Sequence, residues 1–269
     1  TVAGSFGQIL AGKALGLYGS HNILTEQTLF GVGYGPADGG GSTSLGGIGL
    51  GYDYAAWRSQ VKWTSNDMNG FKIAFAVAHA GDADARSLVG AQGTGSRLSN
   101  GNLPTSGLNG VTASEDFRYE ADLSYAGAFD GGSYSAWLSG MSQDQDDLAE
   151  DKSAWTVGGT LSVNNFEFMA QYSDSEGASA TEKLEWDQYV VQAGYRFGGT
   201  TLVSANYSEL TDDSSTRDRA NEDAERITLG VYHDVNANLK LVAEYTQVES
   251  DNDDVLDVDL FSLGGFMFF

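Results

Sequence analysis

Apolar and polar side chains alternate with a period of two residues along most of this 269-residue chain. In the segment WRSQVKWTSN, residues 57–66, Trp57, Val61 and Trp63 share one parity while Arg58 and Lys62 share the other. Successive side chains of a β-strand point to opposite faces of its sheet, whereas a helix repeats every 3.6 residues. The pattern therefore predicts strands that have one apolar and one polar face.

The same alternation predicts strands in twelve segments. They are residues 4–13, 57–66, 71–80, 116–126, 133–142, 153–163, 166–174, 186–197, 200–209, 224–234, 239–249 and 257–269. Residues 30–35 and 45–54 are two further candidates for short strands. The chain contains 36 Gly, 13 Tyr and 13 Phe but only 2 Pro and no Cys, a composition that favours strands joined by turns. We predict an all-β fold without disulfides.

The links between these segments also alternate, between short and long. Very short turns lie at 66–70, 129–132, 164–165, 198–199 and 235–238, and longer polar links lie at 14–56, 81–115, 143–152, 174–185, 210–223 and 250–256. A transmembrane β-barrel has short turns on its periplasmic side and long loops outside. The sequence therefore predicts an antiparallel transmembrane β-barrel.

Two further features agree with a barrel in a membrane. No segment approaches the roughly 20 apolar residues of a membrane helix, yet the chain ends in the apolar run LFSLGGFMFF. On a last barrel strand, Phe261, Leu263, Met267 and Phe269 would face lipid or a neighbouring protomer. The formal net charge of −23 argues against a nucleic-acid partner, because phosphates would be repelled.

Three stretches resemble one family. The final strand ending in Phe resembles the C-terminal assembly signal of bacterial outer-membrane barrels. GSFGQILAGK, residues 4–13, resembles the strand before the inward-folded third loop of Gram-negative general porins, and RSQVKWTSNDMNGFKIAFAVAHAG, residues 58–81, resembles the strand–turn–strand after that loop. The resemblance implies a 16-stranded barrel of which about 12 strands are represented in this sequence. Residues 1–269 would form a single porin β-barrel domain whose first strands are missing, and residues 14–56 its inward-folded constriction loop.

The resemblance also implies a function. Such a porin is a homotrimer in the bacterial outer membrane, surrounded by lipid and lipopolysaccharide, and passively admits small hydrophilic solutes and ions. It is neither an enzyme nor a cofactor-binding protein. The acidic net charge predicts mild cation selectivity.

Charged residues on the predicted inward faces and on the loop are the candidates for the pore constriction, where opposed charges bias ions. They are Lys13, Glu26, Asp38, Arg58, Lys62, Arg118 and Arg196. Lys62 takes a position that is often basic in the family's motif, whereas Ser59 stands where the motif has Asn. The loop carries YGPADGGG in place of the P-E-F tip of some relatives.

Other side-chain groups carry weaker predictions. Carboxylates in two of the predicted outer loops are candidate ligands for Ca²⁺ or for a divalent bridge to lipopolysaccharide, although neither loop has EF-hand spacing. They are Asp144, Asp146, Asp147, Asp251, Asp253 and Asp254. The three His show no zinc spacing. Strand glycines such as Gly158, Gly194 and Gly230 are expected to relieve crowding in the wall.

Two other functions are compatible with the same composition. A soluble β-sandwich that binds glycans or forms a surface layer would stay folded without detergent, whereas a barrel would not. An outer-membrane β-barrel enzyme would need a catalytic set at the barrel rim. His79 and His233 are the candidates by position, but the sequence has no G-x-S-x-G motif to accompany them.

Overall fold

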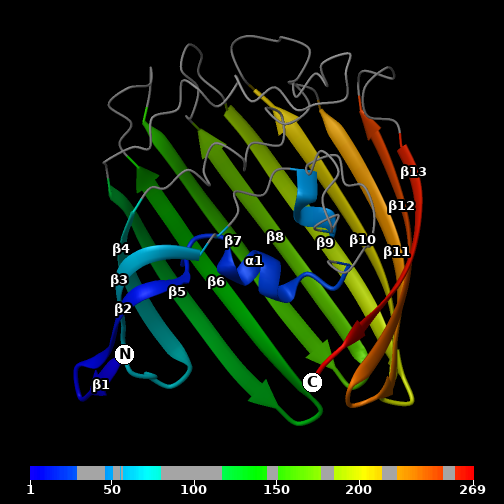
Figure 1. Ribbon diagram of the computed structural model, residues 1–269, viewed down its shortest axis with the longest axis horizontal. Helices are drawn as coiled ribbons and strands as arrows, with labels where there is room; N and C mark the ends of the chain where they lie inside the picture. Colours follow the sequence, from blue (N-terminus) through cyan, green and yellow to red (C-terminus); the bar gives the residue numbers. More distant parts are fainter. Residues whose placement is uncertain are drawn as a thin grey trace.

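The computed structural model describes residues 1–28, 46–50, 55, 57–79, 117–143, 151–176, 185–213, 223–250 and 258–269. In this part of the chain, thirteen strands form one antiparallel sheet in which each strand pairs with its neighbours in sequence (Figure 1). The strands are β1 (Val2–Gly4), β2 (Gly7–Leu15), β3 (Trp57–Thr64), β4 (Phe71–His79), β5 (Phe117–Phe129), β6 (Gly132–Gln143), β7 (Lys152–Val163), β8 (Phe166–Glu176), β9 (Glu185–Phe197), β10 (Thr201–Asp212), β11 (Ala224–Asn236), β12 (Leu239–Ser250) and β13 (Val258–Met267).

All twelve predicted strands are present, and the described residues add the three-residue strand β1. The prediction that residues 45–54 form a strand was wrong for residues 46–50. These residues form the 3₁₀ helix η2 (Gly46–Leu50), where Gly46 adopts a positive φ of 59°. The candidate strand at 30–35 lies outside the described residues. The total of 16 strands remains a prediction.

Tight turns join alternate pairs of strands, as the sequence predicted. Asn69, Gly131, Asn164 and Gly198 adopt positive φ angles of 59°, 81°, 53° and 56° at four of these turns. Glycine and asparagine tolerate this left-handed conformation, which suits the two-residue connections of hairpins. These residues therefore hold consecutive strands in antiparallel register.

The sheet curves around a short helix, α1 (Ser20–Thr25), and around η2 (Figure 1). We call the face that meets these two elements the concave face and the opposite face the convex face. No helix of the described residues is long and apolar enough to span a membrane.

Burial is inverted relative to a water-soluble protein. On β5, Phe117 and Tyr119 on the convex face are 57% and 51% exposed, whereas Arg118 and Glu120 on the concave face are 0% and 3% exposed. The same alternation continues through β13, where Phe261, Leu263 and Met267 are exposed. Soluble monomers rarely expose so extended an apolar surface. The convex face therefore requires an apolar solvent such as lipid, as the alternation predicted.

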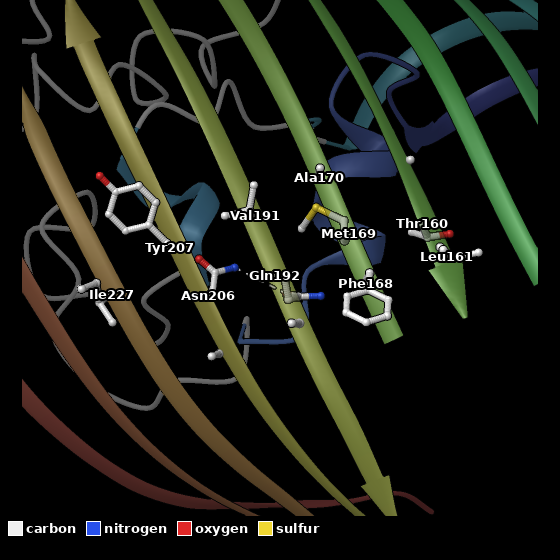
Figure 2. A pocket seen from close by; sticks show the side chains of 13 residues that line it. Thr160, Leu161, Phe168, Met169, Ala170, Val191, Gln192, Asn206, Tyr207 and Ile227 are labelled. Carbon is white, nitrogen blue, oxygen red and sulfur yellow. Dashed lines mark hydrogen bonds between the residues drawn. The ribbon is translucent and has the colours of Figure 1, made fainter. Parts of the chain in front are cut away.

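The convex face also holds a shallow apolar groove of about 690 Å³ across β7 to β11 (Figure 2). Small side chains at Gly159, Ala170, Ala193 and Ala205 leave this space between larger neighbours such as Phe168. Gln192 and Asn206 contribute to the same stretch of wall, but their side chains are buried and joined by a 3.5 Å hydrogen bond. The wall is thus thin, with apolar and polar contacts on opposite sides of it.

Candidate functional site

The segment that follows β2 turns onto the concave face and begins its contacts at β5. Glu120 Oε2 accepts hydrogen bonds from the backbone N–H of Leu17 at 2.5 Å and of Tyr18 at 3.4 Å. Glu120 Oε1 accepts a 2.6 Å bond from Arg118 Nε, and this buried ion pair lies beside the Tyr18 ring, with the guanidinium carbon 5.7 Å from the ring centroid. The first loop residues are thus fixed to the wall by a charged group that is itself paired.

Helix α1 carries the segment across the next strands. Asn22 is 3% exposed, and its Nδ2 donates to Thr156 Oγ1 on β7 at 3.0 Å and to Ser173 Oγ on β8 at 3.3 Å. Ile23 packs against the buried cluster that includes Trp137. This six-residue helix would be unstable alone, because short helices gain too few hydrogen bonds for the residues they order. Contacts with the wall therefore stabilise it.

Gln27 connects the end of this segment to three strands. Its Nε2 donates to Glu167 Oε2 on β8 at 2.7 Å, its Oε1 accepts from Ser204 Oγ on β10 at 2.7 Å, and its backbone N–H donates to Gln192 Oε1 on β9 at 2.8 Å. Gly194 provides the space, because a Cβ there would lie 2.7 Å from Gln27 Oε1. The expectation that Gly194 relieves crowding is confirmed.

Glu26 is buried against β10. Asn206 Nδ2 donates to both carboxylate oxygens, at 3.1 and 3.0 Å, and Thr28 donates to Oε1 through its backbone N–H at 2.7 Å and its hydroxyl at 2.6 Å. Burial raises the pKa of Glu26, and the hydrogen bonds from Thr28, the positive charge of Arg226 and the hydrogen bond from Asn206 only partly offset it. Glu26 therefore anchors the segment.

The loop returns to the concave face at η2. Ile48 is fully buried in a cluster with Trp137, Met169 and Val190. Gln188 Nε2 on β9 donates to the carbonyl oxygens of Gly47 and Ile48, at 3.2 Å each. The two described parts of the loop are thus held by the same region of the wall.

Together these contacts run from β5 to β10 on the concave face (Figure 1). Neighbouring strands lie about 4.8 Å apart, so five spacings correspond to roughly 24 Å of wall. A polar segment fixed across this width occupies space that the curved sheet would otherwise leave to water.

The structure places the candidate constriction residues in different surroundings. Arg58, Arg118 and Glu26 are buried on the concave side, and Lys62 is half-buried on the concave face of β3. Arg196 Nε donates to Glu167 Oε1 at 2.9 Å, with both side chains about one-third exposed or less.

Two other candidates are not brought to this site. Lys13 is exposed, and its cross-strand partner is Ser59 on β3. Ser59 lies two residues from Trp57, so both are on the convex face. The assignment of Lys13 to a concave constriction therefore needs correction, since cross-strand partners share a face. Asp38 lies outside the described residues.

The candidate divalent-cation ligands also lie outside the described residues: Asp144, Asp146, Asp147, Asp251, Asp253 and Asp254. Within the described ranges, no group of three or more His, Cys, Asp or Glu side chains is arranged to hold a metal ion. His79 and His233, the candidates of the enzyme hypothesis, are exposed on the convex faces of β4 and β11.

Sequence reasoning did not identify Asn22, Gln27 or Asn206 as site residues. Asn206 alternates with the apolar residues of β10, so the sequence could have predicted that its side chain points inward. Its partner could not be predicted, because Asn206 and Glu26 are 180 residues apart and no local pattern links them.

A sheet that is apolar outside, polar inside and crossed on its inner face by a folded segment is the wall of an outer-membrane channel. The sequence profile of the Gram-negative porin family matches residues 1–253, and the chain belongs to that family. Its location is the bacterial outer membrane. None of the curated protein sequences matched the chain.

Solved structures share this fold. An anion-selective porin from Comamonas acidovorans is 14% identical with a TM-score of 0.61, over 98% of this chain and 71% of that one. A loop-deletion form of OmpT, an outer membrane protein of Vibrio cholerae, is 16% identical with a TM-score of 0.57, over 97% and 76%. The outer membrane channel DcaP of Acinetobacter baumannii is 14% identical with a TM-score of 0.53, over 97% and 71%. These similarities show the fold of outer-membrane β-barrel porins and do not support the β-sandwich alternative.

Proposed function

We propose that this porin is a passive diffusion channel for small hydrophilic solutes and ions, constricted by residues 14–56 folded onto the concave face. The observation that carries the proposal is the series of hydrogen bonds from Leu17, Asn22, Glu26 and Gln27 to strands β5 to β10. A polar segment attached across a water-filled lumen limits the size of the solutes that pass and exposes them to fixed charges.

The proposal includes mild cation selectivity and a homotrimer without enzymatic activity. The net charge of −23 favours cations near the entrances of the channel. Support for the trimer is the description of one OmpT structure as a trimer form, at 16% identity and a TM-score of 0.56. Arg58, Lys62, Arg118 and Arg196 are the wall cations of the proposed constriction, and Glu26 is its anchoring acid.

The constriction can be tested with engineered disulfides, because the chain has no Cys. Asn22→Cys is combined with Thr156→Cys, whose native side chain accepts the 3.0 Å bond from Asn22. The matched control combines Asn22→Cys with Val157→Cys, one residue along β7 but on the convex face. The porin is purified from outer membranes, and its single-channel conductance is measured in a planar bilayer before and after oxidation.

We expect a disulfide in the Thr156→Cys pair and none in the Val157→Cys pair, with the oxidised channel conducting as the wild type does. Conducting channels in which the Asn22→Cys and Thr156→Cys pair forms no disulfide would contradict the inward-folded loop but not the diffusion channel. Absence of ion conductance in the wild-type protein would overturn the channel.

A further inference from the structure

His21 is placed by α1 against the concave wall. Its Nε2 lies 3.2 Å from Asp122 Oδ2 on β5, and its ring stacks on Trp137 of β6 with centroids 5.3 Å apart and planes 18° apart. Asp122 Oδ2 also accepts a 2.7 Å hydrogen bond from Ser139 Oγ. The carboxylate is thus held in place, and the imidazole is fixed between a charge and an aromatic ring.

His21 differs from the residues around it in its access to water. Its side chain is 33% exposed, whereas that of Asp122 is 8% exposed and Trp137 is 3% exposed. The ring therefore covers the carboxylate, and protons can reach it from the solvent on the concave side.

The other charges near α1 are already engaged. Glu120 and Arg118 lie two and four positions from Asp122 on the concave face of β5 and form their own ion pair. Gln143 on β6 is the cross-strand partner of both Arg118 and Lys152 on β7, so these three residues lie in one row across the wall. On the described parts of β6 to β8, the groups that contact α1 are neutral: Trp137, Thr156 and Ser173. Glu26 follows the helix and is buried against Asn206.

We propose that His21 is a selectivity-determining residue that makes the ion preference of this channel depend on pH. The inference rests on the proposed diffusion channel and its inward-folded loop. Imidazole changes its charge between about pH 5 and 8. An imidazolium neutralises Asp122, so the pair carries no net charge at acid pH. Neutral imidazole leaves the pair with one negative charge, which raises the preference for cations as pH increases.

The expected size follows from Coulomb's law. A unit charge in water attracts a cation and repels an anion equally, so its effect enters the ratio of cation to anion permeability twice. For ions that pass roughly 8 to 16 Å from the pair, this ratio should rise about twofold to fivefold between pH 5 and 8. Dissolved salt reduces the effect within a Debye length of about 10 Å at 0.1 M, so dilute KCl is preferable.

The chain offers its own controls, because it contains three His and the other two lie outside the lumen. His79 is exposed on the convex face of β4, and His233 is exposed on the convex face of β11, where its Nδ1 is 2.9 Å from Thr201 Oγ1. Reversal potentials are measured in a planar bilayer under a KCl gradient between pH 5 and 8. The proteins compared are the wild type, His21→Gln, His79→Gln and His233→Gln.

We expect most of the pH dependence to be lost in His21→Gln and all of it to be kept in His79→Gln and His233→Gln. Asp122→Asn should keep the pH dependence but shift the ratio toward anions at every pH, since the pair then carries zero or one positive charge. A conducting wild-type channel with a constant permeability ratio would overturn the inference and leave the diffusion channel intact. So would a pH response of wild-type size in His21→Gln. A wild-type protein without conductance would instead overturn the proposed function.

Discussion

Replacing Gln27 by Ala tests whether the loop is held to the wall by the hydrogen bonds described above. The substitution removes the 2.7 Å bond to the carboxylate of Glu167 and the 2.7 Å bond from Ser204. A hydrogen bond to a charged group contributes about 1.5–3 kcal/mol, and a neutral one about 0.5–1.5 kcal/mol. Glu167 keeps Arg196, and Ser204 keeps a 3.4 Å bond to Ala193 O, so neither partner is left unsatisfied. We expect Gln27→Ala to lower the free energy of unfolding by about 2–4 kcal/mol.

The assay is guanidinium unfolding of the porin in lipid vesicles, with single-channel recordings of the same preparations. A loosened loop should also increase the noise of the open-channel current. The matched control is Gln8→Ala, because Gln8 lies exposed on β2. Equal unfolding free energies and equal current noise for Gln27→Ala, Gln8→Ala and the wild type would refute the reasoning.

Three other changes test separate parts of the structure. Leu229→Arg, on the exposed convex face near the middle of β11, should cost about 2–4 kcal/mol, as expected near the bilayer midplane and measured by refolding into vesicles. Gly158→Ala should destabilise by about 1–3 kcal/mol in the same assay, because its Cβ would lie 2.3 Å from the buried Trp137 ring; Gly140→Ala, with no contact closer than 3.6 Å, is the control. Burial favours the protonated form of Glu26 in the folded state. Its contribution to stability is therefore present below the ordinary carboxyl pKa and is lost as pH rises through the raised pKa of the folded protein. Unfolding measurements from pH 4 to 8 should show Glu26→Gln gaining stability relative to the wild type as pH increases.

The positions of the strands could be predicted from the sequence because the polarity of each wall residue indicates which face of the sheet it is on. A residue between lipid and water has a strong preference for one of them, and the preference repeats every second position. β11 is an example, since Ile227 and Leu229 are exposed to the convex side while Arg226 and Thr228 are buried on the concave side.

Lys13 shows where this reasoning fails. In QILAGKAL, apolar residues occupy both parities, with Ile9 and Ala11 on one and Leu10 and Ala14 on the other. Such a strand has little contrast between its faces, so its sequence does not specify which side faces inward. Only the register with β3, in which Lys13 opposes Ser59, settles the face of Lys13.

The candidate site was harder to predict than the wall, because it depends on where a polar loop meets a polar surface. Inward residues such as Asn206 and Thr156 are surrounded by alternative hydrogen-bonding groups of the same kind, and water can satisfy any of them. What selects the native contacts is steric space and apolar burial at a few positions. A Cβ at Gly47 would lie 2.0 Å from Asn206 Oδ1, and Ile48 enters the only described cluster that contains Trp137. Hydrogen bonding alone would thus allow the loop to bind the wall in many positions, whereas steric fit allows only a few. Steric fit depends on residues far apart in the chain, so a single sequence does not show it.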